Sequence, residues 1–306
     1  MPGTSRRPLF IEALHFLPGV MTAALLAAAT QADCPSVTTG GAFGADAQVQ
    51  GHAPDDNLGA HPMLFVKNAL VEPNGVARHG KVYLRFDLSA FNVTAVARAW
   101  IQLTIAPGSD GTPPHGPQVF AVWGIPDVST GATGDAPPGR GGWLEGTGTI
   151  AQPSNVGITW NNAPANRGDS GSMLDANAIH LGEFVIDGPG LIHETIQFGS
   201  PALDAFVRSD TNALVTIAVT RLTVEQQTGS AAHRFWSYEG SSLLSPRMLV
   251  NALTIADITG DCRVDGSDLG VLLAQWGPCT GTCTADLTGD GVVDGADLGL
   301  LLAEWG

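Results

Sequence analysis

Apolar and polar residues alternate with a period of two along much of the chain between Cys34 and Leu253. In the stretch KVYLRFDL at residues 81–88, every second residue from Val82 onward is apolar, which predicts a strand with one face toward a core. The same pattern predicts strands at WIQLTI (100–105), QVFAVW (118–123), GEFVID (182–187), LVTIAVT (214–220), HRFWSY (233–238) and PRMLVNAL (246–253). Many short strands with turn-rich connections are typical of an antiparallel β-sandwich. One short helix is expected at PALDAFVRS, residues 201–209.

Residues 257–306 follow a helical period instead. Apolar residues recur there at i, i+3, i+4 and i+7 in two sets: Leu269, Leu272, Leu273 and Trp276, then Leu298, Leu301, Leu302 and Trp305. This spacing predicts two helices, each with one apolar face turned toward a small shared core. No incoming helix is predicted before either of them, because a strand and a Gly/Cys-containing turn precede them.

Composition supports a mainly β chain. Gly (39) and Pro (20) are abundant, which suits a protein with many turns. The net charge of −15 argues against a nucleic-acid partner. From Asp257 onward there are eight Asp and one Glu against a single Arg, so this segment carries −8 of the net charge of −15. Such a concentration of negative charge in one segment calls for an explanation within that segment.

The explanation is a repeated loop. The stretch DITGDCRVDGSDLGVLLAQWG, which begins at Asp257, aligns without a gap with DLTGDGVVDGADLGLLLAEWG, which begins at Asp286. Both place oxygen-bearing residues at positions 1, 3, 5, 9 and 12 of a calcium loop, with position 7 contributing its backbone carbonyl. The predicted ligands are Asp257, Thr259, Asp261, Arg263, Asp265 and Asp268 for one Ca²⁺, and Asp286, Thr288, Asp290, Val292, Asp294 and Asp297 for a second.

The two loops differ at position 6, where the chain must turn sharply. Gly291 suits such a turn, whereas Cys262 takes its place in the first loop and is expected to strain that loop or to tie it to a disulfide. Val264 and Val293, both at position 8, could pair the two loops through a short backbone bridge.

The N-terminus has the features of an export signal. Residues 1–32 contain two arginines, an apolar run and a small-residue cleavage site, which predicts a Sec-type or, less favoured, a twin-arginine signal peptide. The mature chain is then expected to be secreted or held at the cell surface, with no membrane span. The four cysteines, Cys34, Cys262, Cys279 and Cys283, are expected to form disulfides whose pairing the sequence leaves open.

Two calcium loops with only outgoing helices resemble a dockerin module, which would occupy residues 255–306 as a small all-α unit. Dockerins bind cohesin domains. The resemblance therefore implies a cohesin-like receptor, or another cell-surface protein, as the partner of this segment.

Residues 33–254 carry a second resemblance. The stretches ADAQVQGHAPDDNLG, LFVKNA, KVYLRFDLSAF, GITWNNAPA and RFWSYEGSSLLSPRMLV occur in the order found in exported DNRLRE-type β-sandwiches, a family similar to a group of carbohydrate-binding modules. The resemblance implies a jelly-roll-like fold and a polysaccharide ligand. Trp160, in the stretch TWNNAP, is better explained as a packed corner than as a sugar platform.

No catalytic residue is predicted. The acids Glu145, Glu183, Glu194 and Glu225 lie in separate segments without a glycosidase motif. We therefore expect a non-catalytic exported protein that serves targeting or scaffolding in polysaccharide degradation. The alternatives are a structural or adhesive cell-surface protein with a docking tail, and a glycan-active hydrolase or lyase.

Overall fold

The computed structural model describes residues 34–41, 43–69, 78–108, 116–127, 143–224, 232–252, 255–259, 261–279 and 283–306. The signal peptide predicted for residues 1–32 lies outside these ranges. Residue 254, the last residue predicted for the larger module, also lies outside them. Within the described ranges, no helix is long and apolar enough to cross a membrane.

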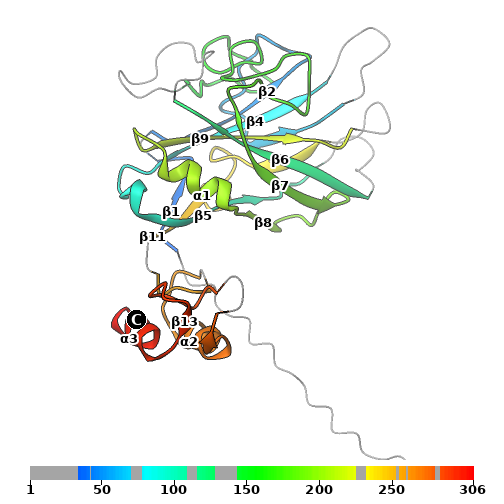
Figure 1. Ribbon diagram of the computed structural model, residues 1–306. Coiled ribbons are helices and arrows are strands. Elements are labelled where there is room, and N and C mark those ends of the chain that lie inside the picture. Colours follow the sequence, from blue (N-terminus) through cyan, green and yellow to red (C-terminus); the bar gives the residue numbers. More distant parts are fainter. Residues whose placement is uncertain are drawn as a thin grey trace, which may run out of the picture. The chain divides into compact units, whose positions relative to one another are not determined.

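The described chain is mainly β, and its sheets are antiparallel, as the sequence predicts (Figure 1). One sheet has the order β1 (Ser36–Thr38), β11 (Arg247–Ala252), β5 (Val96–Thr104) and β8 (Thr195–Phe198). The other has the order β2 (Ala45–Gln50), β4 (Gly80–Asp87), β9 (Leu214–Arg221), β6 (Pro117–Ile125) and β7 (Ile179–Asp187). A separate pair joins β3 (Met63–Val66) to β10 (His233–Trp236). All seven stretches predicted as strands overlap strands in the structure.

The main core lies between these sheets. Val82, Leu84 and Phe86 of β4 are fully buried in it, together with Ile101 and Leu103 of β5. These are the residues whose period-two spacing predicted an inward face. The arrangement is consistent with a β-sandwich.

Helix α1 (Pro201–Arg208) forms where the sequence predicts it and packs against β5 and β7. Ser200 caps it, accepting a hydrogen bond from the Leu203 amide at 3.0 Å, and Pro201 occupies its first turn. Its buried face adds Phe206 and Val207 to the main core. A 3₁₀ turn, η1 (Val93–Ala95), leads into β5.

The outer face of the five-stranded sheet is also buried along β4, whereas β7 leaves Val185 exposed. Tyr83 and Arg85, on the side of β4 away from the main core, are covered by a second apolar cluster that includes Trp143 and Ile158. Residues 143–178, a long segment with little regular structure, supply much of this cover. Alternate side chains of β4 therefore point into two different buried layers, one on each face of the sheet. The sequence pattern alone does not distinguish this arrangement from a sheet with one exposed face.

Lys81 anchors the covering segment. Its buried ammonium donates to Asn166 Oδ1 at 2.7 Å and to the carbonyls of Arg167 and Met173 at 3.0 and 2.9 Å. It also lies 4.7 Å from the centre of the Trp160 ring. Trp160 is 5% exposed, which confirms that it is a packed corner.

The C-terminal segment contains two helices, α2 (Gly266–Ala274) and α3 (Gly295–Ala303), which contact each other. Their small core is built from residues that recur twenty-nine positions apart: Ala256 with Ala285, Val264 with Val293, and Leu272 with Leu301. All six are buried. Each half of the repeat therefore contributes the same three side chains to one shared core, as predicted.

The backbone bridge between Val264 and Val293 is wrong. Strand β13 (Val292–Val293) pairs instead with β12 (Gly277–Pro278), so that Val293 lies opposite Gly277. Correspondingly, the Gly306 amide donates to the Val264 carbonyl at 3.1 Å. Each loop thus pairs with a residue just beyond the helix of the other half, which links the two halves.

Candidate metal centre

The first acidic loop brings three of its predicted ligands together. Asp257, Asp261 and Asp268 each offer a carboxylate oxygen, and these atoms lie within 4.8 Å of one another. Asp268 is fully buried and Asp257 nearly so, although ionised carboxylates are costly to bury without a cation or hydrogen-bond donors. The convergence supports the ligand assignment made from spacing.

Backbone amides hold these carboxylates in place. Asp257 accepts from the amides of Asp261 and Cys262 at 3.1 and 2.8 Å. Asp261 accepts from the Arg263 amide at 3.0 Å through Oδ1 alone. Asp265 caps helix α2 by accepting from the Ser267 amide at 2.8 Å. A short loop whose carboxylates fold back on its own amides turns alternate side chains toward one centre.

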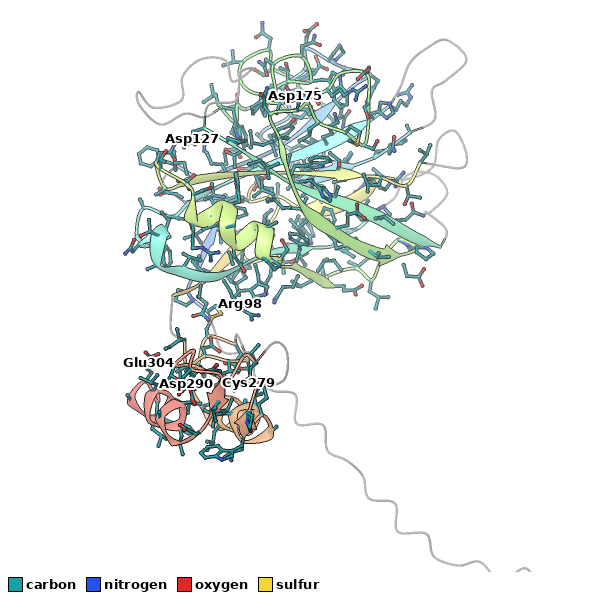
Figure 2. The ribbon with its side chains drawn as sticks, viewed as in Figure 1. Arg98, Asp127, Asp175, Cys279, Asp290 and Glu304 are labelled. Carbon is teal, nitrogen blue, oxygen red and sulfur yellow. A yellow bond between two sulfur atoms is a disulfide. The ribbon has the colours of Figure 1, made fainter. Side chains whose placement is uncertain are left out.

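The second loop repeats these hydrogen bonds at the equivalent residues. Asp286 accepts from the amides of Asp290 and Gly291 at 3.1 and 2.9 Å. Asp290, which is labelled in Figure 2, accepts from the Val292 amide at 2.9 Å. Asp294 caps helix α3 through the Ala296 amide at 2.7 Å. Of the two loops, as far as the structure describes them, only the first has three carboxylates within 4.8 Å of one another. The sequence repeat is therefore a structural repeat, with the second loop more open.

Position 12 closes each loop. Asp268 accepts from the Thr259 amide and hydroxyl through one oxygen and from the Asp265 amide, at 2.9 Å, through the other. Asp297 does the same with the amides of Thr288 and Asp294. Burial raises the pKa of Asp297, but the hydrogen bonds from Asp294, Thr288 and Leu287 outweigh it and hold that pKa below its usual value. The hydrogen bonds therefore favour the ionised form of Asp297, the form in which a carboxylate would bind calcium.

The donor set fits calcium. Every side chain predicted to face the ion offers oxygen, and neither loop places a His nitrogen or a free thiol in the ligand positions. Arg263 and Val292 are exposed, which leaves their carbonyls as the possible donors of position 7. A hard cation that takes six to eight oxygens in flexible geometry matches such loops.

The disulfides settle the pairing that the sequence left open. Cys34 bonds to Cys262, and Cys279 bonds to Cys283. Cys262 also adopts a left-handed backbone with φ of 69°, close to the 90° of Gly291 at the same loop position. Both expectations for Cys262 are confirmed: it carries strain that a glycine would avoid, and it is tied to a disulfide.

The predicted apolar faces of the helices are wrong in part. Leu272 and Leu301 are buried, but Leu273, Trp276, Leu302 and Trp305 are 54%, 48%, 53% and 46% exposed. Each helix has nine residues, so Trp276 and Trp305 lie beyond its end, and Leu273 and Leu302 are turned about 100° from the buried leucines. The result is an exposed Leu–Trp pair on each half of the repeat.

One sheet face of the larger module combines a half-buried indole with charged and polar side chains. Along β5, Ala99, Ile101 and Leu103 are buried, whereas Arg98 is exposed and Trp100 is half-buried (Figure 2). The polar residues Gln102, Gln197 and Arg247 lie in register across β5, β8 and β11. A pocket of about 220 Å³ next to Trp100 is lined by residues that include Arg98, Ser200 and Asp204.

The comparisons with known proteins add no relative to these observations: no protein-family model matches the chain, and no curated protein matches it significantly in sequence.

Proposed function

We propose that this chain is an exported, non-catalytic protein that joins a carbohydrate-binding, jelly-roll-like sandwich to a calcium-dependent, dockerin-like docking module. In this role it targets or scaffolds polysaccharide degradation. The observation that carries the proposal is the duplicated loop, in which the same carboxylates accept the same backbone amides in both halves. Two calcium ions held this way would fix the two helices relative to each other.

The exposed Leu–Trp pairs support docking. Tryptophan is enriched among the residues that dominate binding energy at protein interfaces. Here Trp276 and Trp305 lie at equivalent positions of the repeat, and about half of each side chain is exposed to solvent. A cohesin-like receptor is the partner proposed for this surface, and another cell-surface protein would use the same side chains.

Docking is expected to depend on both calcium and these indoles. We expect residues 32–306 to bind a member of a panel of recombinant cohesin domains in calcium and to lose binding in EDTA. The double substitution Trp276→Ala and Trp305→Ala should weaken binding by about 2 kcal/mol or more, roughly thirtyfold. Leu300→Ala, which alters another exposed apolar residue of α3, is the control. Binding that survives both EDTA and the double substitution would rule out this docking surface.

Polysaccharide binding is proposed for the outer face of β5, β8 and β11. An indole flanked by guanidinium and amide groups can stack on a sugar ring while its neighbours hydrogen-bond the hydroxyls. The sequence lacks a recognised catalytic pair, and this favours binding over glycoside cleavage, because cleavage needs two carboxyl groups that flank the scissile bond.

We expect Trp100→Ala to weaken binding to the best ligand of a polysaccharide array by about tenfold, or about 1.4 kcal/mol. Val185→Ala, at an exposed position of β7 in the other sheet, should leave binding unchanged. If no polysaccharide binds while calcium-dependent docking persists, the structural or adhesive role replaces the carbohydrate-binding one. Release of reducing sugars or unsaturated products would instead indicate a glycan-active enzyme.

A further inference from the structure

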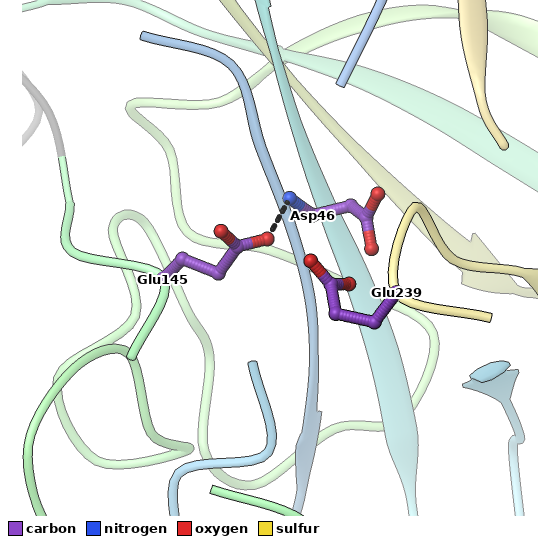
Figure 3. Close-up of side chains that lie close together, drawn as sticks. All are labelled: Asp46, Glu145 and Glu239. Atoms are coloured by element: carbon purple, nitrogen blue, oxygen red, sulfur yellow. Dashed lines mark hydrogen bonds between the residues drawn. The ribbon is translucent and has the colours of Figure 1, made fainter. Parts of the chain in front are cut away.

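A second group of acids converges outside the calcium loops. Asp46 belongs to β2, Glu145 to the segment that covers the five-stranded sheet, and Glu239 to the turn after β10 (Figure 3). One carboxylate oxygen from each lies within 4.8 Å of the other two. Three segments far apart in the sequence therefore bring three carboxyl groups to one place.

Asp46 has no exposed surface, and its carboxylate is only half satisfied. Oδ2 accepts hydrogen bonds from the Thr39 hydroxyl and from the Tyr238 amide, the latter at 3.0 Å. Oδ1 is buried and has no hydrogen-bond partner. A buried carboxylate oxygen without a donor costs several kcal/mol unless another group neutralises it. This atom is an observation separate from the convergence of the three acids.

The protein supplies little positive charge here. Glu145 accepts from the Asp46 amide at 2.7 Å, which fixes its orientation but does not neutralise it. Arg85 lies close enough to attract Glu145, yet its guanidinium donates to the carbonyls of Phe43 and Trp143. Burial, with the nearby charge of Glu239, raises the pKa of Asp46 to about 7 and that of Glu145 to about 8. Without a cation, the group is short of positive charge.

We propose that Asp46, Glu145 and Glu239 bind a hard divalent cation, with calcium as the natural occupant. All three donors are oxygens, with no His or Cys in the cluster, and this favours calcium over zinc or copper. Asp46 forms the buried wall of the site, and Glu145 is half-buried beside it. Glu239 is exposed and leaves an approach from solvent, where water would complete the coordination shell.

Such an ion would connect β2, the covering segment and the turn after β10. β2 and the covering segment already share an apolar cluster, and hydrogen bonds from the Asp46 amide to Glu145 and from the Tyr238 amide to Asp46 link the three elements. The site would therefore stabilise the larger module, independently of the two ions proposed for the C-terminal loops.

Counting bound calcium tests the site. In native mass spectrometry of residues 32–306, which form one compact unit, we expect three calcium ions per chain and two after Asp46→Asn. Asn keeps the acceptor that Thr39 and Tyr238 use but removes the charge. Glu183→Gln, which neutralises an exposed acid on β7, should leave three. Calcium should also raise the unfolding temperature of the larger module in wild type and not in Asp46→Asn.

The outcomes separate this site from the proposed docking module. Two ions in both wild type and Asp46→Asn would overturn the sandwich site and leave the loops intact. One ion in wild type and none in Asp46→Asn would support it while contradicting the loops. If Asp46→Asn does not fold, Glu239→Gln replaces it, because Glu239 is exposed; an unchanged calcium count in that variant would equally refute the proposal.

Discussion

Asp268→Asn and Asp297→Asn should each strongly weaken calcium binding in one loop and loosen the helix that follows it. Asp268 and Asp297 are fully buried and accept hydrogen bonds through both oxygens. Asparagine replaces one of these oxygens with an NH₂ group, which would face a backbone N–H donor instead of accepting from it. It also removes the charge that attracts the ion. Position 12 should therefore tolerate this substitution worse than any other in the loop.

The expected magnitude follows from linkage. At free calcium about a hundred times the dissociation constant, binding adds about 2.7 kcal/mol of stability per site, so both loops together add about 5 kcal/mol. That is comparable to the whole stability expected of a small domain. We expect each substitution to weaken calcium binding in its loop by about a hundredfold, and the double substitution to remove the cooperative unfolding of residues 255–306.

Isothermal titration calorimetry and circular dichroism on residues 32–306, with and without EDTA, provide the measurement. Glu304→Gln removes an acidic group at the end of α3 without touching either loop and should change neither signal (Figure 2). Helicity and unfolding of the wild-type segment that are identical with and without EDTA would show that the repeat does not need metal to fold.

The sequence predicted correctly those features of the structure that depend on contacts between residues close together in the chain. The period-two stretch around Val82 and Leu84 predicted β4 correctly because a strand's two faces are set by neighbouring residues. The two similar acidic loops followed from a repeat whose offsets lie within twelve residues. The capping of α2 by Asp265 likewise involves residues three positions apart.

The failures came from contacts between distant segments. Nothing near Tyr83 in sequence indicates that residues 143–178 cover it. The cluster of Asp46, Glu145 and Glu239 joins acids about a hundred positions apart, so each one looked isolated along the chain. The Leu273 and Leu302 error has a different cause. Helical spacing correctly grouped the apolar residues, but a small duplicated core has room for only one leucine per helix at its centre.

The disulfide between Cys34 and Cys262 should contribute the other large effect. It closes a loop with a sequence separation of 228, from the residue two before β1 to position 6 of the first calcium loop. In the chain-entropy description, a loop of this length stabilises the folded state by about 5 kcal/mol, and less where the unfolded chain stays compact. The Cys279–Cys283 disulfide spans a separation of 4 and should contribute about 2 kcal/mol.

Urea unfolding of residues 32–306 in saturating calcium compares the two disulfides directly. We expect Cys34→Ser with Cys262→Ala to lose more than twice the free energy of unfolding that Cys279→Ser with Cys283→Ser loses. In the Cys34→Ser background, Cys262→Gly should recover about 1 kcal/mol relative to Cys262→Ala, because glycine accepts the left-handed backbone at position 6 as Gly291 does. Equal stability of the Gly and Ala variants would mean that the disulfide, and not the loop, imposes the left-handed turn at Cys262.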